Sequence, residues 1–160
     1  MKVSIGIPFF NAELYLEYSI KSVIKQSFLD WELILVDDGS TDRSLEIAHS
    51  FAQKDSRIRI ISDGENKKLP ARLNQIIEEA KYDYIARMDA DDLMHPNRIE
   101  KQLNILKNNP DYDLVSSGLV SIDNKNQVKG YRNVDNLIKV DGNSNNTPII
   151  HASILAKKSW

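Results

Sequence analysis

The chain contains no cysteine. Disulfide bonds, thiolate metal sites and thiol nucleophiles are therefore excluded, and any metal ion must be held by oxygen or imidazole ligands. The sequence also lacks long runs of like charge, because 21 lysines and arginines are interspersed with 23 aspartates and glutamates for a net charge of −2. Without a basic patch there is no electrostatic footprint for a polyanion, so we expect no nucleic-acid partner.

Long apolar segments are missing as well. Stretches such as LILV at 33–36 are far too short to cross a membrane, and the N-terminus lacks the small-residue cleavage site of a signal peptide. We therefore predict a cytoplasmic protein without a membrane span, which leaves room for peripheral association with the inner face of the membrane. The length of 160 residues suits a single domain with a sizeable core.

The first 110 residues alternate between strand and helix patterns. Apolar residues at every second position predict a strand at 3–9, and the nearly continuous apolar run at 31–36 predicts a strand covered on both faces. Further strands are expected at 58–61 and 84–88. Helices are predicted by four groups of apolar residues at helical spacing, namely Leu16, Ile20, Val23 and Ile24; Leu45, Ala48 and Ala52; Leu69, Leu73, Ile76, Ile77 and Ala80; and Ile99, Leu103 and Leu106. Asn11 is expected to cap the first of these helices.

This alternation predicts an α/β fold. Its mostly parallel sheet would have right-handed crossovers, helices on both faces and a ligand site beyond the carboxyl ends of the strands. After Asp111 the pattern changes to short apolar segments separated by asparagine, aspartate, lysine and glycine. We expect short additional strands after residue 111 in the same domain, and a mobile loop at 141–148.

Two clusters of carboxylates follow predicted strands. Asp37 and Asp38 come after the second strand, and Asp89, Asp91 and Asp92 come after the fourth, so both clusters should lie at the same edge of the sheet. Like charges this close are costly unless a cation or hydrogen-bond donors compensate them. Mg²⁺ or Mn²⁺ would suit such a site, because it takes one or two carboxylates and leaves its other positions to water and phosphate. The alternative, which the residues leave open, is that both clusters cap the following helices and lie solvated.

Three other acidic-motif interpretations do not fit the sequence. An EF-hand loop beginning at Asp89 would have Met94 where a glycine is required and Leu93 at a ligand position. A phosphatase with an aspartyl nucleophile carries its paired aspartates after the first strand, where this chain has PFFNAE. A nucleotidyltransferase needs a glycine-rich loop there, which Gly6 alone cannot form.

Four sequence blocks carry a family resemblance. In this order and spacing, SIGIPFFN, WELILVDDGSTD, PARLNQIIEEA and YIARMDADD resemble the inverting family 2 glycosyltransferases with a GT-A (Rossmann-like) fold. The resemblance covers about residues 2–110 well and PIIHASIL more loosely. It implies a single GT-A nucleotide-sugar-binding domain over residues 1–160, with a nucleotide-binding βα core at 1–110 and the start of the acceptor-side region at 111–160.

The resemblance implies roles for the residues after the first two strands. The loop from Pro8 to Asn11 would cover the nucleotide, with Pro8 and Phe10 near the base. Asp37 and Asp38 match the family's nucleotide-binding acidic block, in which the second acid hydrogen-bonds the uracil ring.

Further roles are implied for the fourth block, whose Asp89, Ala90 and Asp91 match the family's DXD motif. Asp89 and Ala90 would lie by the ribose, and Asp91, with Asp89, would bind Mn²⁺ or Mg²⁺ bridging the two phosphates. Lys68 and Arg72 are candidates for phosphate or base contacts, against the alternative of solvated helix charges. His151 is a candidate acceptor-side contact, against the alternative of an ordinary structural histidine.

The implied reaction is metal-assisted, inverting transfer of a sugar from a nucleoside-diphosphate-sugar, preferably a UDP-sugar, to a hydroxyl of a glycan or lipid-linked acceptor. Such a reaction would serve polysaccharide or cell-surface glycan synthesis. The family's general base is an acid that follows the block resembled by PIIHASIL, but no acid follows Asp141. We therefore expect a chain truncated at its C-terminus, with the base beyond Trp160. Asp123 is an in-chain alternative that also fits a turn, and a non-catalytic sugar-nucleotide- or carbohydrate-binding module is the alternative function.

Overall fold

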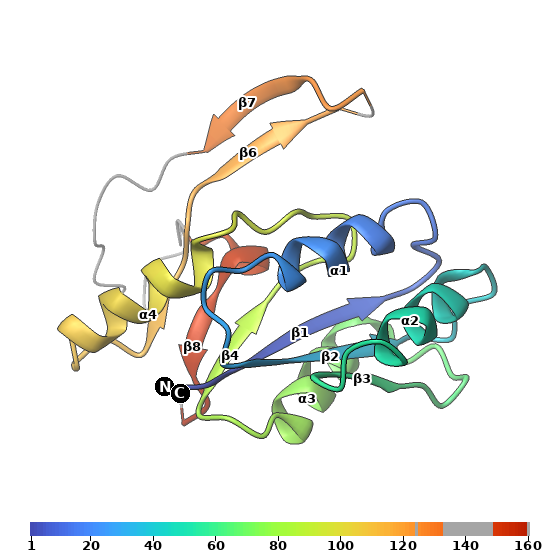
Figure 1. Cartoon of the computed structure of the whole chain (residues 1–160), viewed down its shortest axis with the longest axis horizontal. Coiled ribbons are helices and arrows are strands. Elements are labelled where there is room, and N and C mark those ends of the chain that lie inside the picture. Colours follow the sequence, from blue (N-terminus) through green and yellow to red (C-terminus); the bar gives the residue numbers. More distant parts are fainter. Residues whose placement is uncertain (124, 133–148, 160) are drawn as a thin grey trace.

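The computed structural model describes residues 1–123, 125–132 and 149–159 (Figure 1). The loop predicted at 141–148 lies outside the described residues. In chain order the elements are β1 (Val3–Phe9), α1 (Leu16–Ile24), β2 (Trp31–Asp37), α2 (Ser44–Ala52), β3 (Ile58–Ile61), α3 (Lys68–Glu79), β4 (Tyr84–Arg87), α4 (Arg98–Asn108), β5 (Leu114–Val115), β6 (Leu119–Ile122), β7 (Val128–Arg132), the 3₁₀ helix η1 (His151–Ser153) and β8 (Leu155–Lys157).

The main sheet has six strands in the order β3-β2-β1-β4-β8-β5. The strands β3, β2, β1 and β4 are parallel, whereas β8 runs antiparallel between β4 and β5. The predicted α/β fold, with a mostly parallel sheet and short strands after residue 111, is confirmed. Of the two strands that the C-terminal region adds to this sheet, β8 lies beside β4 and β5 lies beyond β8, so both extend the layer formed by residues 1–110.

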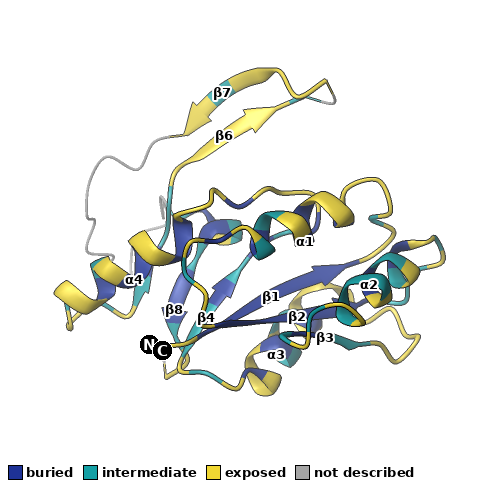
Figure 2. Ribbon diagram, in the orientation of Figure 1, coloured by how far each residue is buried: buried dark blue, intermediate teal, exposed yellow. Residues whose placement is uncertain are grey.

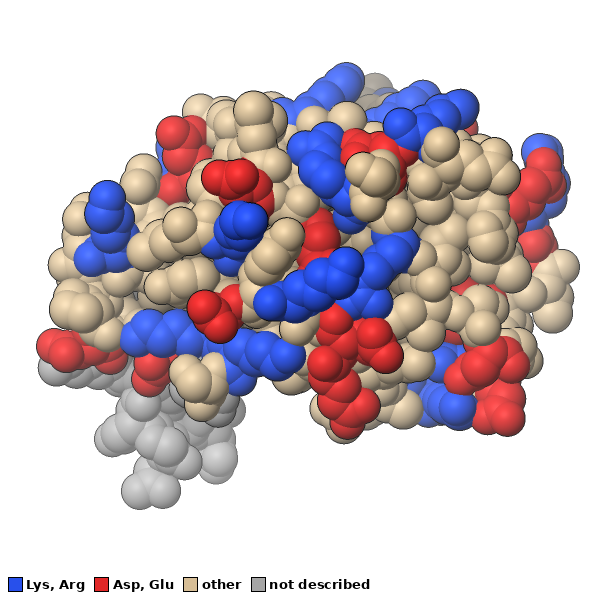
Figure 3. Space-filling model, turned by 60° about the horizontal axis from the view of Figure 1, so that its bottom comes forward, with Lys and Arg blue, Asp and Glu red and all other residues tan. Residues whose placement is uncertain are grey.

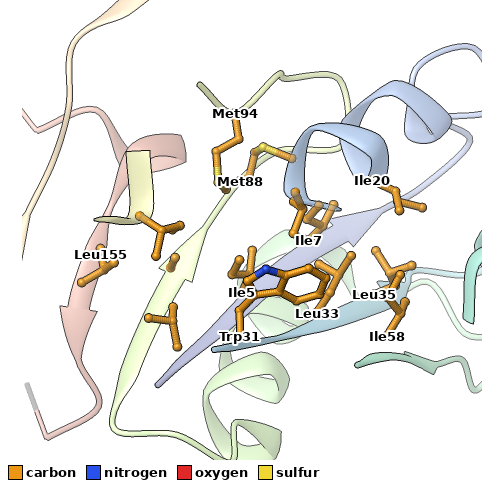
Figure 4. Packing of buried hydrophobic residues seen from close by; sticks show 14 of the residues in the cluster. Ile5, Ile7, Ile20, Trp31, Leu33, Leu35, Ile58, Met88, Met94 and Leu155 are labelled. Atoms are coloured by element: carbon orange, nitrogen blue, oxygen red, sulfur yellow. The ribbon is translucent and has the colours of Figure 1, made fainter. Parts of the chain in front are cut away.

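Helices cover both faces of the sheet, as predicted. The odd-numbered residues of β1, including Ile5 and Ile7, point into a core shared with α1, α2 and α4 (Figure 4). On the opposite face Ile34 and Val36 of β2 pack against Ile76 of α3. The central strands β1 and β2 are therefore buried throughout their length (Figure 2), which explains the nearly continuous apolar run of β2.

Gly6 allows α3 to approach the sheet. A Cβ atom added at Gly6 would lie 2.3 Å from Cγ2 of Ile76, closer than two carbon atoms can pack. The missing side chain thus sets how closely α3 lies against β1. Because α3 also carries Arg72, this packing helps to place a charged side chain of the candidate site.

The predicted capping role of Asn11 is wrong. Helix α1 begins at Leu16 and has no side-chain cap hydrogen bond. Asn11 instead has a φ of 48°, and its Oδ1 accepts a hydrogen bond of 2.8 Å from the backbone N–H of Thr41. The side chain therefore bonds to the loop after β2, a long-range partner that local sequence does not reveal.

The strands β6 and β7 form a separate hairpin that stands away from the main sheet (Figure 1). Asp123 follows β6, where its Oδ1 accepts from the backbone N–H groups of Lys125 at 2.8 Å and Gln127 at 3.0 Å. Its Oδ2 pairs with Lys129 at 2.9 Å. The alternative that Asp123 is a turn residue is confirmed.

Replacing Gly6 with alanine tests the close packing of α3. We expect Gly6→Ala to lower the free energy of unfolding by about 1–3 kcal/mol, because the added methyl group overpacks the contact with Ile76. Gly130→Ala on β7 is the matched control, since a Cβ there meets no atom within 4 Å, and it should change the free energy by less than about 0.5 kcal/mol. Urea denaturation of both variants gives the two values, and equal effects would contradict the packing argument.

Candidate functional site

The two acidic loops flank the carboxyl end of β1. Strand β1 lies between β2 and β4, and the N–H of Asp38 donates to the carbonyl oxygen of Phe9 at 2.8 Å. Because neighbouring strands are about 4.8 Å apart, the ends of β2 and β4 are separated by roughly 10 Å. The acids after these strands therefore lie along one edge of the sheet, as the alternation of strands and helices predicted.

Asp37 organises the turn after β2. Its buried carboxylate accepts hydrogen bonds from the backbone N–H of Ser40 at 2.9 Å and from the hydroxyl of Ser62 at 2.8 Å. Each oxygen thus already has a donor within the protein. Asp37, one of the residues expected to bind nucleotide, therefore stabilises the turn after β2 through hydrogen bonds within the protein.

Asp38 is held by donors from α3 and the loop before it. Its Oδ1 accepts from the backbone N–H of Lys67 at 2.7 Å and from Nε of Arg72 at 2.9 Å. The N–H of Lys68 lies 3.1 Å from both carboxylate oxygens, and Lys68 has the left-handed φ of 71°. The carboxylate therefore keeps its negative charge compensated, while Oδ2 retains capacity to accept another bond.

Arg72 is completely buried rather than solvated. Besides Asp38, its guanidinium pairs with Asp63 at 2.6 Å and donates to the carbonyl oxygen of Glu65 at 2.5 Å. Hydrogen bonding within this group raises the pKa of Arg72 and lowers the pKa of Asp63. The alternative of a solvated charge is wrong for Arg72, because its buried side chain connects α3 to the loops that follow β2 and β3. On the face turned forward in Figure 3, acidic and basic side chains lie intermixed.

The stretch from Pro8 to Asn11, expected to be a loop, begins inside β1 and combines buried and exposed residues. Pro8 is buried within β1, where it aligns with Val36 of β2. Phe10 is 49% exposed, so its ring is accessible at the edge of the sheet. The N–H of Asn11 donates to the hydroxyl of Ser40 at 3.1 Å, which ties this loop to the acidic loop after β2.

The DXD acids differ in their surroundings. Oδ1 of Asp89 pairs with Nη2 of Arg87 at 2.8 Å, and Ala90 is buried. Asp91 is exposed. Helix α4 has no side-chain cap hydrogen bond, so the alternative that these acids cap the following helix is not supported.

The surroundings of Asp92 raise the pKa of its carboxyl group. Loss of hydration raises the pKa of Asp92, and the negative charges of Asp89 and Asp91 raise it further. Arg98 and His151 oppose this shift. Arg98 is itself buried, and burial lowers its pKa to about 10.

His151 lies close enough to the acidic loop for its charge to act on Asp92. It is exposed at the start of η1. This segment is held by two residues of α4, since Gln102 donates to the carbonyl oxygen of Ser153 at 2.7 Å and Arg98 to that of Ile154 at 3.3 Å. The structure thus brings His151 to the DXD side of the edge.

Helix α1 holds the loop after β4 through residues that the sequence did not single out. The Ser19 hydroxyl contacts the carbonyl oxygens of Ala90 and Asp92 at 2.6 and 2.7 Å. Further along, the Ser22 hydroxyl accepts from the N–H of Met94 at 3.0 Å. Gln26 Nε2 then donates to the carbonyl of His95 at 2.8 Å. The available signal was the spacing of these polar residues, which recur every three or four positions beside the apolar stripe of α1.

The donor set fits a divalent cation that is shared with a substrate. Across the residues that the structure describes, nowhere do three or more histidine, aspartate or glutamate side chains gather so that they could hold a metal ion. Mg²⁺ and Mn²⁺ typically use one or two carboxylates and complete their coordination with phosphate oxygens and water. The exposed Asp91 and the neighbouring Asp89 offer such hard oxygen ligands.

The fold is that of GT-A enzymes. The chain is similar to S. aureus TarS 1–349 in complex with UDP-GlcNAc, with a TM-score of 0.69 and 23% identity over 81% of this chain and 37% of that one. It is also similar to the mannosyltransferase PcManGT from Pyrobaculum calidifontis in complex with GDP-Man and Mn²⁺, with a TM-score of 0.68 and 20% identity over 72% of this chain and 35% of that one. At these identities the likeness establishes the fold.

The sequence establishes the family. The profile described as "Glycosyl transferase family 2" matches residues 4–156, so the chain belongs to glycosyl transferase family 2. The putative glycosyltransferase EpsE of Bacillus subtilis (strain 168) is 40% identical over 159 residues, which are 99% of this chain and 57% of EpsE. The putative teichuronic acid biosynthesis glycosyltransferase TuaG of the same organism is 36% identical over 104 residues, which are 65% of this chain and 41% of TuaG. The chain thus spans about half the length of these relatives.

The helices in the described part of the chain fall short, in length and apolar character, of what a bilayer crossing needs.

Removing the Asp92 carboxylate tests whether the raised pKa of this group destabilises the folded protein at neutral pH. A carboxyl whose pKa is raised on folding destabilises the protein at pH values above that pKa, where it must ionise in the folded state. Asp92→Asn should therefore raise the free energy of unfolding at pH 7, and the gain should vanish below about pH 3.9, where aspartate is neutral in both states. Denaturation at a series of pH values measures this, with Asp111→Asn in the exposed turn after α4 as control. Destabilisation by Asp92→Asn at pH 7 would contradict the argument.

Proposed function

We propose that the protein is an inverting glycosyltransferase that transfers a sugar from a UDP-sugar to an acceptor hydroxyl with the help of Mn²⁺ or Mg²⁺. The exposed Asp91 beside Asp89, across the end of β1 from Asp38, is the observation that carries this proposal. We place the reaction in cytoplasmic synthesis of a polysaccharide or cell-surface glycan, with a glycan or lipid-linked acceptor. Membership of glycosyl transferase family 2 and the likeness to a teichuronic acid biosynthesis enzyme support this class of product.

The nucleotide would lie along the edge formed by the ends of β2, β1 and β4. Oδ2 of Asp38 can accept a hydrogen bond from the N–H of a uracil ring, because Arg72 and the backbone N–H of Lys68 hold the carboxylate in place. Phe10 is exposed beside this carboxylate's loop and can pack against the base. Asp89 and Ala90 would then lie by the ribose, and Lys68 contributes through its backbone N–H to Asp38.

Asp91 would coordinate the cation, and Asp89 would contribute to the same site. A bound cation supplies Lewis-acid stabilisation of the charge that grows on the departing diphosphate. By holding that cation, Asp91 would help to orient the diphosphate. Asp89 keeps its ion pair with Arg87, which limits the repulsion among the three carboxylates.

The acceptor would approach from the side of η1. His151 is exposed there and close to the DXD loop, so it can contact an acceptor hydroxyl. A general base must also remove the hydroxyl proton, because a sugar hydroxyl is too weakly acidic to attack unaided. None of the described residues is assigned that role.

Removing the charge of Asp91 tests the cation site. We expect Asp91→Asn to reduce the affinity for UDP in MnCl₂ by about tenfold or more, since even groups that only orient metal ligands are worth 10–100-fold in metal affinity. The affinity in EDTA should stay unchanged. Isothermal titration calorimetry with UDP measures both, and Asp111→Asn is the matched control. Unaltered Mn²⁺-dependent UDP affinity in Asp91→Asn would exclude the proposed site.

Comparison of nucleotides tests the role of Asp38. UDP should bind more tightly than CDP in MnCl₂, because Asp38 accepts from a ring N–H that uracil presents and cytosine lacks, and GDP is compared as well because guanine carries a ring N–H of its own. The same calorimetric titration with all three diphosphates measures the preference. Tighter binding of GDP would contradict the assignment of uridine.

A further inference from the structure

The hydroxyl of Ser19 touches the DXD loop on both sides of Asp91. Ser19 is completely buried in α1, and its Oγ lies 2.6 Å from the carbonyl oxygen of Ala90 and 2.7 Å from that of Asp92. The segment after β4 runs alongside α1 in Figure 1. A single side chain therefore contacts the residues immediately before and after the proposed cation ligand.

These contacts fix the local backbone around Asp91. The two carbonyl groups that flank Asp91 converge on one hydroxyl, which carries one proton and shares it between them. The N–H of Asp92 also donates to the carbonyl of Asp89 at 3.2 Å, closing the turn. With the carbonyl groups of Ala90 and Asp92 turned toward α1, Asp91 is left exposed at the edge of the sheet.

Helix α1 is itself anchored to the loop on the other side of the site. The backbone N–H of Ala12 donates to the hydroxyl of Ser44 at 2.7 Å. The N–H of Glu13 donates to Asp42 at 3.1 Å. The segment before α1 is thus hydrogen-bonded to residues that follow Asp38. Ser19 links the DXD loop to this same helix.

We propose that Ser19 is a positioning residue that holds Asp91 in the geometry needed to bind the cation. The inference rests on the proposed function, because it assigns Ser19 a part in the same site. A cation that takes one or two protein carboxylates depends strongly on their placement before it binds, since the protein supplies few other ligands. Groups that orient metal ligands are typically worth 10–100-fold in metal affinity.

The test compares two serine-to-alanine variants of the same helix. Ser19→Ala removes the hydroxyl that contacts the carbonyl groups of Ala90 and Asp92. Ser22→Ala removes the hydroxyl that accepts from the N–H of Met94 further along the same loop. UDP affinity is measured by calorimetry in MnCl₂ and in EDTA, and thermal unfolding is followed for both variants. We expect Ser19→Ala to lose about tenfold in UDP affinity in MnCl₂ and to stay within about twofold in EDTA. Ser22→Ala should stay within about twofold of the unaltered protein in both media, although it also loses one hydrogen bond.

The outcomes separate this inference from the proposed function. If the unaltered protein shows no Mn²⁺-dependent affinity for UDP, both proposals fail together. If that affinity is present and Asp91→Asn abolishes it, but Ser19→Ala retains it, the role of Ser19 alone is refuted. An equal loss in Ser22→Ala would also refute it, because any tether of the loop would then suffice. A loss confined to Ser19→Ala in MnCl₂ supports the positioning role.

Discussion

Compensation of like charge at the carboxyl edge of the sheet governs how the site is built. The acids there differ in their hydrogen-bond and ion-pair partners. Asp37 accepts hydrogen bonds from a backbone amide and a hydroxyl. Asp38 accepts them from two amides and from the buried guanidinium of Arg72. Asp89 has Arg87. The remaining repulsion is concentrated at Asp91 and Asp92, which is where a cation brought by a diphosphate would relieve it.

Local sequence was sufficient to predict the layer structure. The uninterrupted apolar run at 31–36 predicted a strand buried on both faces, and the structure places Leu33 and Leu35 in one core cluster and Ile34 and Val36 in the other. Helical spacing of apolar residues likewise located each of the four helices. These signals are strong because burial acts on every residue of an element, so the pattern repeats over several turns or pleats.

Pairings between distant segments could not be predicted from the sequence. Asn11 looked like a helix cap because its local context fits one, but Thr41 across the edge offers a donor that only the fold brings near. Arg72 was a candidate for phosphate or base contacts, with a solvated helix charge as the alternative, yet it pairs with Asp38 and Asp63. In each case the deciding partner is a polar group remote in sequence, and such single contacts leave no periodic pattern.

The antiparallel insertion of β8 beside β4 has a consequence for synthesis on the ribosome. Tyr84 of β4 pairs with Lys157 of β8, so one edge of β4 has no strand partner while the intervening chain is still being made. An open strand edge can pair with other chains and promote aggregation. The nascent protein therefore needs its last described strand before this edge of β4 is shielded from neighbouring polypeptides.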